Sequence, residues 1–150
     1  MIVKSNTNPE WTYTVEIILP PSKIVTGNFV LLSEDPNNPK VARLTLCFEG
    51  RETSKVGTSF DYALNSIREE LEKGGILLKC WGSSRNVWPS SVTSGMGRVG
   101  RAYRRYMGKK PAQDDIVVIF ESGTDVDPCT LQEQREAHNQ WRSSVGISKK

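Results

Sequence analysis

Apolar and polar side chains alternate along the first part of the chain. Between Trp11 and Ile17, every second residue is large and apolar, and the residues between them are threonine or glutamate. A period of two residues predicts a strand with one buried face. Two further apolar runs, at 29–32 and 41–48, lie between turns rich in glycine, proline and asparagine and predict two more strands. Because the connections are short, we expect these three strands to form an antiparallel meander.

A helical period follows this predicted sheet. Large apolar residues recur there at the spacing of one helix face: Phe60, Leu64, Ile67 and Leu71. This spacing predicts an amphipathic helix. Thr58 or Ser59 is expected to cap its first turn, and Gly74-Gly75 to end it. Arg68 and Glu72 stand four residues apart, so we expect them to form an ion pair on the outer face of the helix.

In the segments after this helix, apolar runs, β-branched residues and helix-start residues indicate different structures. The run 76–81 is apolar on both faces, which favours a central strand. Residues 102–107 fit a strand or a short helix. The β-branched run 116–120 favours a strand, yet Pro111 followed by Asp114-Asp115 is also typical of a helix start. Both alternatives remain open for each of these two segments.

A final helix is predicted over 128–144, with Thr130 as its cap. Leu131, Arg135, His138 and Trp141 follow helical spacing within it. We find no internal repeat and no linker, so residues 1–150 are expected to form one domain. Strands and helices occur in mixed order. The predicted fold class is therefore α+β, a single domain with a mostly antiparallel sheet and two main helices.

Composition restricts the class of protein. Hydrophobic residues make up 37% and charged residues 25% of the chain, which is typical of a folded domain. No apolar run approaches the roughly 18 residues that a membrane span needs, and no signal peptide is visible. Cys47, Cys80 and Cys129 are odd in number and far apart, so free thiols in a reducing compartment are expected. These observations predict a cytoplasmic location and no membrane association.

Charge is segregated although the net charge is only +3. The segment 81–110 contains cations and no acid: Arg85, Arg98, Arg101, Arg104, Arg105, Lys109 and Lys110. The next segment, 111–138, is almost entirely acidic: Asp114, Asp115, Glu121, Asp125, Asp127, Glu133 and Glu136, with Arg135. Either the two segments neutralise each other in the fold, or one of them faces a charged partner.

The motifs of enzymes and cofactor-binding proteins find little support. Gly95-Met96-Gly97-Arg98-Val99-Gly100 matches G-x-G-x-x-G, but a dinucleotide site needs a strand that leads directly into the first glycine. Here the preceding predicted strand ends near Trp81. The single histidine, His138, lies in a polar helical stretch, where a solvated side chain is expected. We therefore expect no catalytic residue, no cofactor and no metal ion.

The basic segment 85–110 could instead bind single-stranded nucleic acid. Arg98, Arg101, Arg104 and Arg105 could contact phosphates, and Tyr103 could stack on a base. The competing interpretation is structural. An edge strand protected by arginines would have the same composition, because charged side chains prevent edge-to-edge pairing.

Three stretches of the second half carry a resemblance to a known family. They are Gly75–Ser90, Ser94-Gly95-Met96-Gly97 and Ala102-Tyr103. Together they resemble small bacterial immunity proteins of contact-dependent inhibition and polymorphic-toxin systems, in particular those that neutralise EndoU-type nuclease toxins. The resemblance begins near residue 58. It implies a non-enzymatic cytoplasmic protein that binds one cognate toxin 1:1 and occludes its active site.

The resemblance supplies no contact residues, so candidates come from charge and residue type. An RNA-cleaving toxin has a cationic cleft, which an acidic surface would complement. The acidic candidates are Asp114, Asp115, Glu121, Asp125 and Asp127. Trp88 and Arg85 could serve as anchors instead, since tryptophan and arginine are favoured at binding hot spots. Trp88 packed under its own loop is an equally good interpretation.

Overall fold

The computed structural model describes residues 11–88 and 100–146. Four consecutive antiparallel strands make most of its larger sheet: β1 (Trp11–Leu19), β2 (Lys23–Leu32), β3 (Ala42–Phe48) and β4 (Arg51–Gly57). A short fifth strand, β5 (Leu77–Lys79), pairs with β1, so the strand order is β4-β3-β2-β1-β5. The predicted meander is confirmed, and it contains one strand more than expected, β4.

The two faces of this sheet differ as the alternation predicts. Val15 and Ile17 of β1, Phe29 and Leu31 of β2, and Leu46 of β3 are buried on the inner face. The outer face carries hydroxyl-bearing side chains on all four long strands: Thr12, Thr14, Thr26, Thr45 and Ser54. Burial of the inner face supplies the hydrophobic stabilisation of the sheet.

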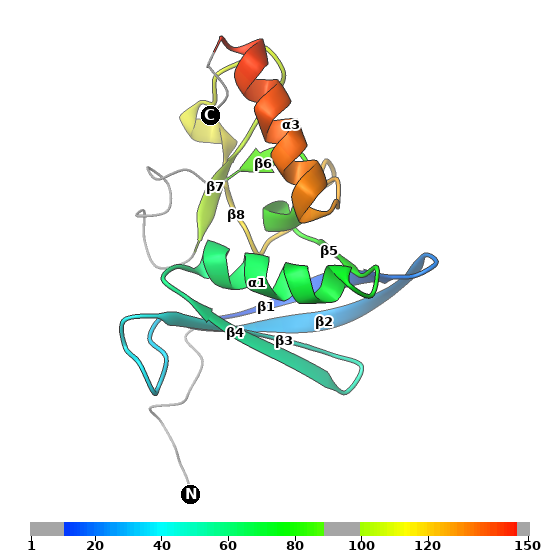
Figure 1. Cartoon of the computed structure of the whole chain (residues 1–150), viewed down its shortest axis with the longest axis vertical. Helices are drawn as coiled ribbons and strands as arrows, with labels where there is room; N and C mark the ends of the chain where they lie inside the picture. Colours follow the sequence, from blue (N-terminus) through cyan, green and yellow to red (C-terminus); the bar gives the residue numbers. More distant parts are fainter. Residues whose placement is uncertain (1–10, 89–99, 147–150) are drawn as a thin grey trace, which may run out of the picture.

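Helix α1 (Phe60–Glu72) lies across the inner face of the sheet, and its apolar side is buried against the strands (Figure 1). Ser59 stands at the cap position, but its hydroxyl donates to the Asp61 carboxylate instead of accepting from the backbone. The predicted Arg68–Glu72 ion pair is present, with Nε and Oε2 3.9 Å apart. The prediction that it lies on the outer face is wrong, because Arg68 is only 2% exposed. Its side chain points away from solvent into the second part of the molecule.

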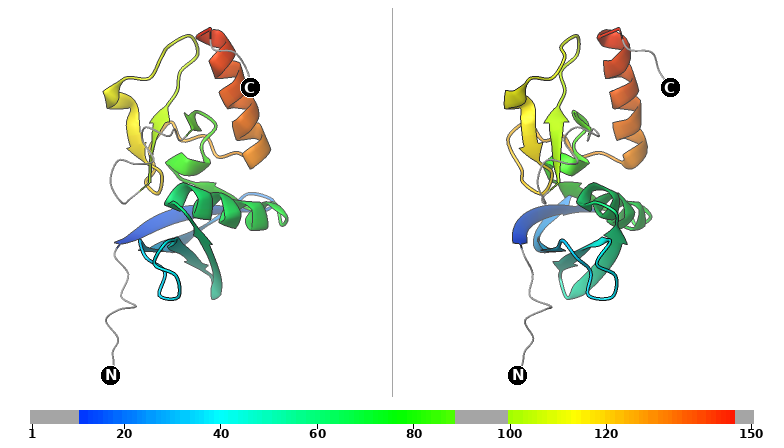
Figure 2. Two further views of the ribbon diagram at one scale, coloured as in Figure 1. Left: turned by 60° about the vertical axis from the view of Figure 1, so that its left-hand side comes forward. Right: turned by 90° about the vertical axis from the view of Figure 1, so that its left-hand side faces the viewer.

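The second part comprises a small sheet and a helix. Its elements are the 3₁₀ turn η2 (Trp81–Ser83), β6 (Val87–Trp88), β7 (Arg101–Arg104), the 3₁₀ turn η3 (Gln113–Asp115), β8 (Ile116–Val118) and α3 (Leu131–Ser144). The strand order is β6-β7-β8, all antiparallel. Both open alternatives are thereby decided: 101–104 is a strand, and a single 3₁₀ turn precedes the strand at 116–118. Figure 2 shows α3 standing beside this small sheet, above α1.

The prediction of a central strand at 76–81 is wrong. β5 forms one edge of the larger sheet, and the chain turns into η2 directly after Cys80. The run is apolar because Ile76, Leu78 and Trp81 all belong to the hydrophobic core. The segment after β8 lies against η2, where Trp81 N–H donates to the Glu121 carbonyl and Gly82 N–H to the Ile119 carbonyl, both at 2.8 Å.

One continuous hydrophobic core joins the two parts. Phe120, which follows β8, enters the core of the larger sheet. Its ring stacks on Tyr13 at 5.7 Å between centroids and meets Phe29 and Phe60 edge-on at 5.0 and 5.9 Å. The fold is α+β, with mostly antiparallel sheets and two main helices, as predicted.

Candidate functional site

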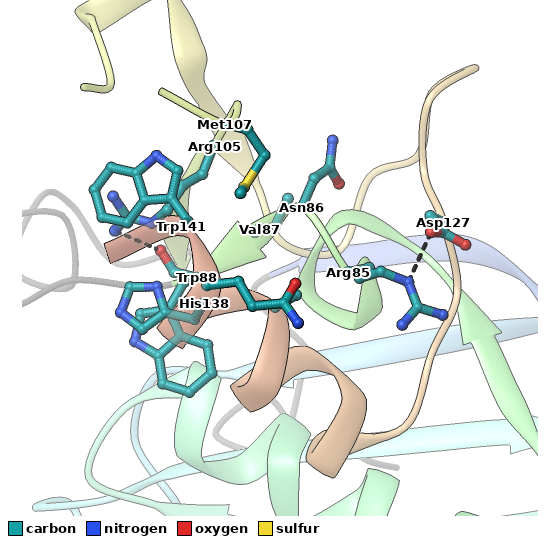
Figure 3. Close-up of a pocket in the computed structure, with 11 residues that line it drawn as sticks. Arg85, Asn86, Val87, Trp88, Arg105, Met107, Asp127, His138 and Trp141 are labelled. Atoms are coloured by element: carbon teal, nitrogen blue, oxygen red, sulfur yellow. Dashed lines mark hydrogen bonds and ion pairs between the residues drawn. The ribbon is translucent and has the colours of Figure 1, made fainter. Parts of the chain in front are cut away.

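A groove of about 220 Å³ opens between β6, the turn after β7 and the outer part of α3 (Figure 3). Its walls combine aromatic, aliphatic and charged side chains: Arg85, Asn86, Val87, Trp88, Arg105, Met107, Asp127, Ala137, His138, Gln140 and Trp141. Met107 is the most exposed of the large apolar side chains in the described part of the protein, at 64%. The groove therefore offers apolar surface to solvent beside charged groups.

A series of stacked planar groups forms one end of the groove. The His138 imidazole is parallel to the Trp88 indole, at 4.4 Å between centroids and an interplanar angle of 5°. It also stacks on Trp141, at 5.7 Å and 17°. The Arg105 guanidinium lies over the Trp141 ring, 4.5 Å from its centroid. The Trp141 indole N–H donates to the Lys109 carbonyl at 2.9 Å, which fixes the orientation of the ring.

The expectation that His138 is a solvated helix residue is wrong. The imidazole is half-buried between the two indoles, and its Nδ1 atom is buried with no hydrogen-bond partner in the described residues. Burial, together with the nearby charges of Arg105 and Arg142, lowers the pKa of His138 to about 4. The side chain is therefore neutral at pH 7 and acts as an apolar packing group.

Arg105 is the principal cation of this end. Its Nη2 atom donates to the Trp88 carbonyl at 3.2 Å, and its guanidinium contacts the Tyr103 and Trp141 rings. Within residues 11–88 and 100–146, no carboxylate lies within ion-pairing distance of it, and its Nε atom is buried without a hydrogen-bond partner. Burial chiefly, and Arg142 to a smaller extent, lower the pKa of this guanidinium.

An ion pair between Arg85 and Asp127 forms the opposite end of the groove. Arg85 Nε donates to Asp127 Oδ2 at 3.0 Å, and both side chains are largely exposed. The backbone supports the pair, because Arg85 N–H donates to the Asp127 carbonyl at 2.8 Å. Three predicted contact residues, Arg85, Trp88 and Asp127, thus line one groove.

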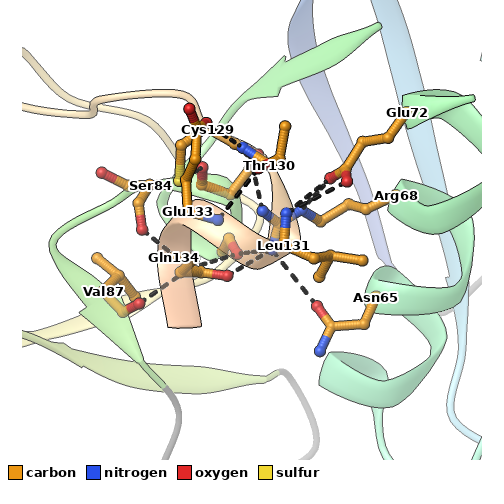
Figure 4. A network of polar contacts seen from close by, with 12 residues as sticks. Asn65, Arg68, Glu72, Ser84, Val87, Cys129, Thr130, Leu131, Glu133 and Gln134 are labelled. Atoms are coloured by element: carbon orange, nitrogen blue, oxygen red, sulfur yellow. Dashed lines mark hydrogen bonds and ion pairs between the residues drawn. The ribbon is translucent and has the colours of Figure 1, made fainter. Parts of the chain in front are cut away.

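A buried polar network holds the groove walls in place (Figure 4). Arg68 Nη1 donates to Gln134 Oε1 at 2.6 Å and to the Gly82 carbonyl at 3.0 Å, and Nη2 donates to the Cys129 carbonyl at 3.0 Å. Gln134 Nε2 in turn donates to three carbonyls, those of Gly82, Ser84 and Val87, at 3.2, 2.9 and 2.9 Å. The network therefore connects α1, α3 and the chain before β6.

The other predicted acidic residues lie against the basic segment. Arg104 Nη2 donates to the Asp114 carbonyl at 3.1 Å and lies 4.0 Å from Asp115 Oδ1. The Tyr106 hydroxyl donates to Asp125 Oδ2 at 3.3 Å. Together with the Arg85–Asp127 pair, these contacts support the interpretation that the two charged segments partly neutralise each other. Glu121 is exposed and lies outside the groove.

The described residues among those expected to bind single-stranded nucleic acid lie in different environments and do not line one site. Arg101 is exposed, whereas Arg104 and Arg105 are half-buried and engaged as described above. Tyr103 is half-buried and pairs with Trp88 in the small sheet. Arg98 lies outside the described residues. Of the members of this set that the structure describes, only Arg105 lines the groove.

The glycine motif can be followed only at its last position, because Gly95–Val99 lie outside the described residues. Gly100 leads directly into β7, and its carbonyl accepts from Ile119 N–H at 3.1 Å. A dinucleotide fingerprint would place a helix N-terminus there. The strand after Gly100 therefore contradicts that use of the motif.

The cysteines are free thiols, as predicted. Cys80 and Cys129 are buried, and burial raises the pKa of each thiol to about 11. Such thiols stay protonated at neutral pH and are weak nucleophiles.

The sequence pattern indicated no site role for several residues of the groove and its support: Arg68, Met107, Gln134, His138 and Trp141. A different helical stripe would have revealed Gln134. Gln134 lies on the same face of α3 as His138 and Trp141, four and seven residues on, and is 4% exposed, whereas the expected Arg135 is exposed.

Comparison with protein-family models gives no match, and a search of curated proteins likewise gives none. No helix in the described ranges is long and apolar enough to cross a bilayer.

Proposed function

We propose that this chain is an immunity protein, which binds a cognate secreted nuclease toxin 1:1 in the cytoplasm and neutralises it without catalysing a reaction. The observation that supports the proposal best is the groove between β6 and α3. It presents tryptophan, arginine and methionine, residue types enriched at protein interfaces. The family resemblance of residues 75–103 supplies the class of partner.

The rigidity of the groove also supports a binding role. Its walls come from segments about fifty residues apart, and the Arg68–Gln134 network fixes both. Preformed walls reduce the entropy lost when a partner binds. The stacked indoles and imidazole restrict the walls further, so little rearrangement is needed on association.

The acidic residues take a smaller part in this proposal than charge alone suggested. Asp115, Asp125 and Asp127 are engaged with Arg104, Tyr106 and Arg85. The exposed carboxylates of Asp114 and Glu121 supply the acidic contacts to a cationic toxin surface.

The test is calorimetric titration of the purified protein with the toxin domain encoded beside its gene. We expect a 1:1 complex that weakens with salt, and protection of cells that express the toxin. Trp88→Ala should weaken the complex by at least about tenfold if Trp88 is a hot spot. Ile24→Ala is the matched control, because Ile24 is 57% exposed on the larger sheet.

Two results would contradict the proposal. One is the absence of a complex with the neighbouring gene product, or a neighbour that encodes no toxin. The other is tight, strongly salt-dependent binding of single-stranded oligonucleotides that is lost on replacing Arg101 and Arg104 by glutamate, which would establish the nucleic-acid alternative.

A further inference from the structure

We propose that the groove between β6 and α3 takes an acidic segment of the partner protein, with an apolar side chain between the walls and an adjacent carboxylate at Arg105. This inference rests on the proposed function and identifies which surface of the toxin the protein grips. The acidic residues of this chain cannot make this contact, because it pairs the Arg105 cation with a carboxylate of the partner.

The walls select the apolar part of the occupant. Val87 and Ala137 line the groove beside the indoles of Trp88 and Trp141, and the exposed Met107 stands at its opening. Methionine adapts its shape to an incoming side chain because it is unbranched and polarizable. Burying one aliphatic side chain here contributes about 1.5–3 kcal/mol before the costs of association.

Arg105 determines that the occupant of the groove carries an anionic group beside its apolar side chain. Its guanidinium is half-buried and has one carbonyl and two aromatic rings as partners, without a carboxylate among the described residues. Arg142 lies close enough to lower the pKa of Arg105. A half-buried cation without a counter-charge is costly, and an incoming carboxylate offsets that cost. The geometry of guanidinium and carboxylate also favours paired hydrogen bonds.

A protein segment fits the groove better than nucleic acid does. The other end of the groove is the mutually neutralised Arg85–Asp127 pair, which offers no net positive charge to a continuous phosphate backbone (Figure 3). The planar groups that could stack on bases already stack on one another and on Arg105. A single carboxylate next to an apolar residue meets Arg105 without approaching Asp127.

The sign of the charge fixes where the contact lies on the toxin. A nuclease binds phosphates through a cationic cleft, whereas the Arg105 end of the groove needs an anion. The groove therefore grips the toxin outside its phosphate-binding cleft. Asp114 and Glu121 lie outside the groove. These two carboxylates contact the cationic surface of the toxin.

The experiment uses the full chain labelled with ¹⁵N and follows its four indole N–H signals by NMR. The probe is a capped peptide with one leucine between an aspartate and a glutamate. Matched peptides replace both acids by amides or by lysines, and a short oligothymidine serves as the nucleic-acid probe. We expect the acidic peptide alone to shift the Trp88 and Trp141 signals, and its affinity to fall with salt. Trp11 and Trp81 lie outside the groove and report on the fold.

Two variants sharpen the test. Arg105→Gln should weaken peptide binding by at least about tenfold, since it removes the cation that pairs with the carboxylate. Met107→Ala should weaken it by about fivefold and cannot unfold the protein, because Met107 is 64% exposed. Ile24→Ala should have no effect.

The outcomes separate this inference from the proposed function. Equal shifts with the lysine peptide, no shift at millimolar acidic peptide, or shifts caused by oligothymidine would each overturn the inference. Toxin binding that is unchanged in Arg105→Gln and Met107→Ala would also overturn it, while leaving the immunity function intact. Peptide binding without toxin binding would overturn the immunity function and leave the groove as an acidic-peptide site.

Discussion

At the scale of single residues, two polar side chains determine how the groove is held. Gln134 is 4% exposed and satisfies three backbone carbonyls as well as Arg68. Arg68 is 2% exposed and depends on Gln134 for its shortest hydrogen bond. Buried polar groups are costly unless paired, so each of these residues makes the other tolerable.

Gln134→Ala is therefore expected to reduce the free energy of unfolding by about 3 kcal/mol, because carbonyls and a buried guanidinium lose partners together. Urea denaturation would measure the change. The matched control is Gln132→Ala, two residues earlier on the exposed side of α3, which should change stability by less than about 0.5 kcal/mol. Similar losses in both variants would contradict the role assigned to the network.

His138 gives a pH prediction. Its pKa is about 4 in the folded protein, against 6.5 for an unperturbed histidine, because of burial and then the charges of Arg105 and Arg142. The unfolded chain therefore binds a proton more readily than the folded one. This contribution to stability is complete above about pH 6.5 and is lost as the pH falls toward 4.

The corresponding variant is His138→Phe, which keeps an aromatic ring between the indoles and removes the titration. Urea unfolding at pH 7.5 and pH 4.5 should show a smaller loss of stability in this variant than in the wild type. The carboxylates contribute equally to both proteins, so the difference isolates the histidine. An identical loss in the two proteins would rule out the buried neutral imidazole.

At the scale of elements, hydrophobic periodicity predicted those helices and strands whose burial depends on one apolar face. β1, β3 and α1 each bury one face on the core, so their apolar residues repeat at the period of the element, whereas α3 buries only Gln134 and Trp141. β4 was missed because its less exposed positions carry Thr53, Lys55 and Gly57, so the alternation of burial has no hydrophobic pattern in the sequence. β5 was placed centrally because the run 76–81 is apolar throughout, yet it is an edge strand whose apolar residues are buried in the common core.

The groove was only partly predictable for a related reason. Trp88 and Arg85 were recognised by residue type, but their neighbours His138 and Trp141 come from an element about fifty residues later. Arg68 was assigned to solvent because a charged residue in a helix usually faces water. Only the long-range partners Gly82, Cys129 and Gln134 explain its burial.

The start of α3 supplies a prediction at this scale. Thr130 Oγ1 accepts from Glu133 N–H at 3.1 Å, and Glu133 Oε1 accepts from Thr130 N–H at 2.9 Å, a complete capping box. Thr130→Ala should lower the free energy of unfolding by about 1 kcal/mol. Ser59→Ala is the control, because its hydroxyl makes no cap bond to the backbone. An equal effect at both positions would contradict the cap assignment.

At the scale of the whole molecule, Phe120 connects the small sheet to the core of the larger one. Its ring contacts Tyr13, Phe29 and Phe60, and it is 1% exposed. A shared core makes the two parts unfold together, because neither buries its apolar surface alone.

We expect Trp11 in the larger sheet and Trp141 in α3 to report the same unfolding midpoint in urea. Phe120→Ala should lower the free energy of unfolding by about 3–5 kcal/mol and separate the two midpoints, the Trp141 transition coming first. Indole NMR signals can follow both residues in one titration. Separate midpoints in the wild type would show that the two parts fold independently.

The division between a buried polar network and an exposed aromatic groove has an evolutionary consequence. Arg68 and Gln134 hold the backbone of the walls, whereas Met107 and Gln140 line the groove with exposed side chains. Exchange of the opening residues therefore changes recognition at little cost in stability. In homologues of this chain, we expect Arg68 and Gln134 to be conserved and the residues at the groove opening to vary with the cognate toxin.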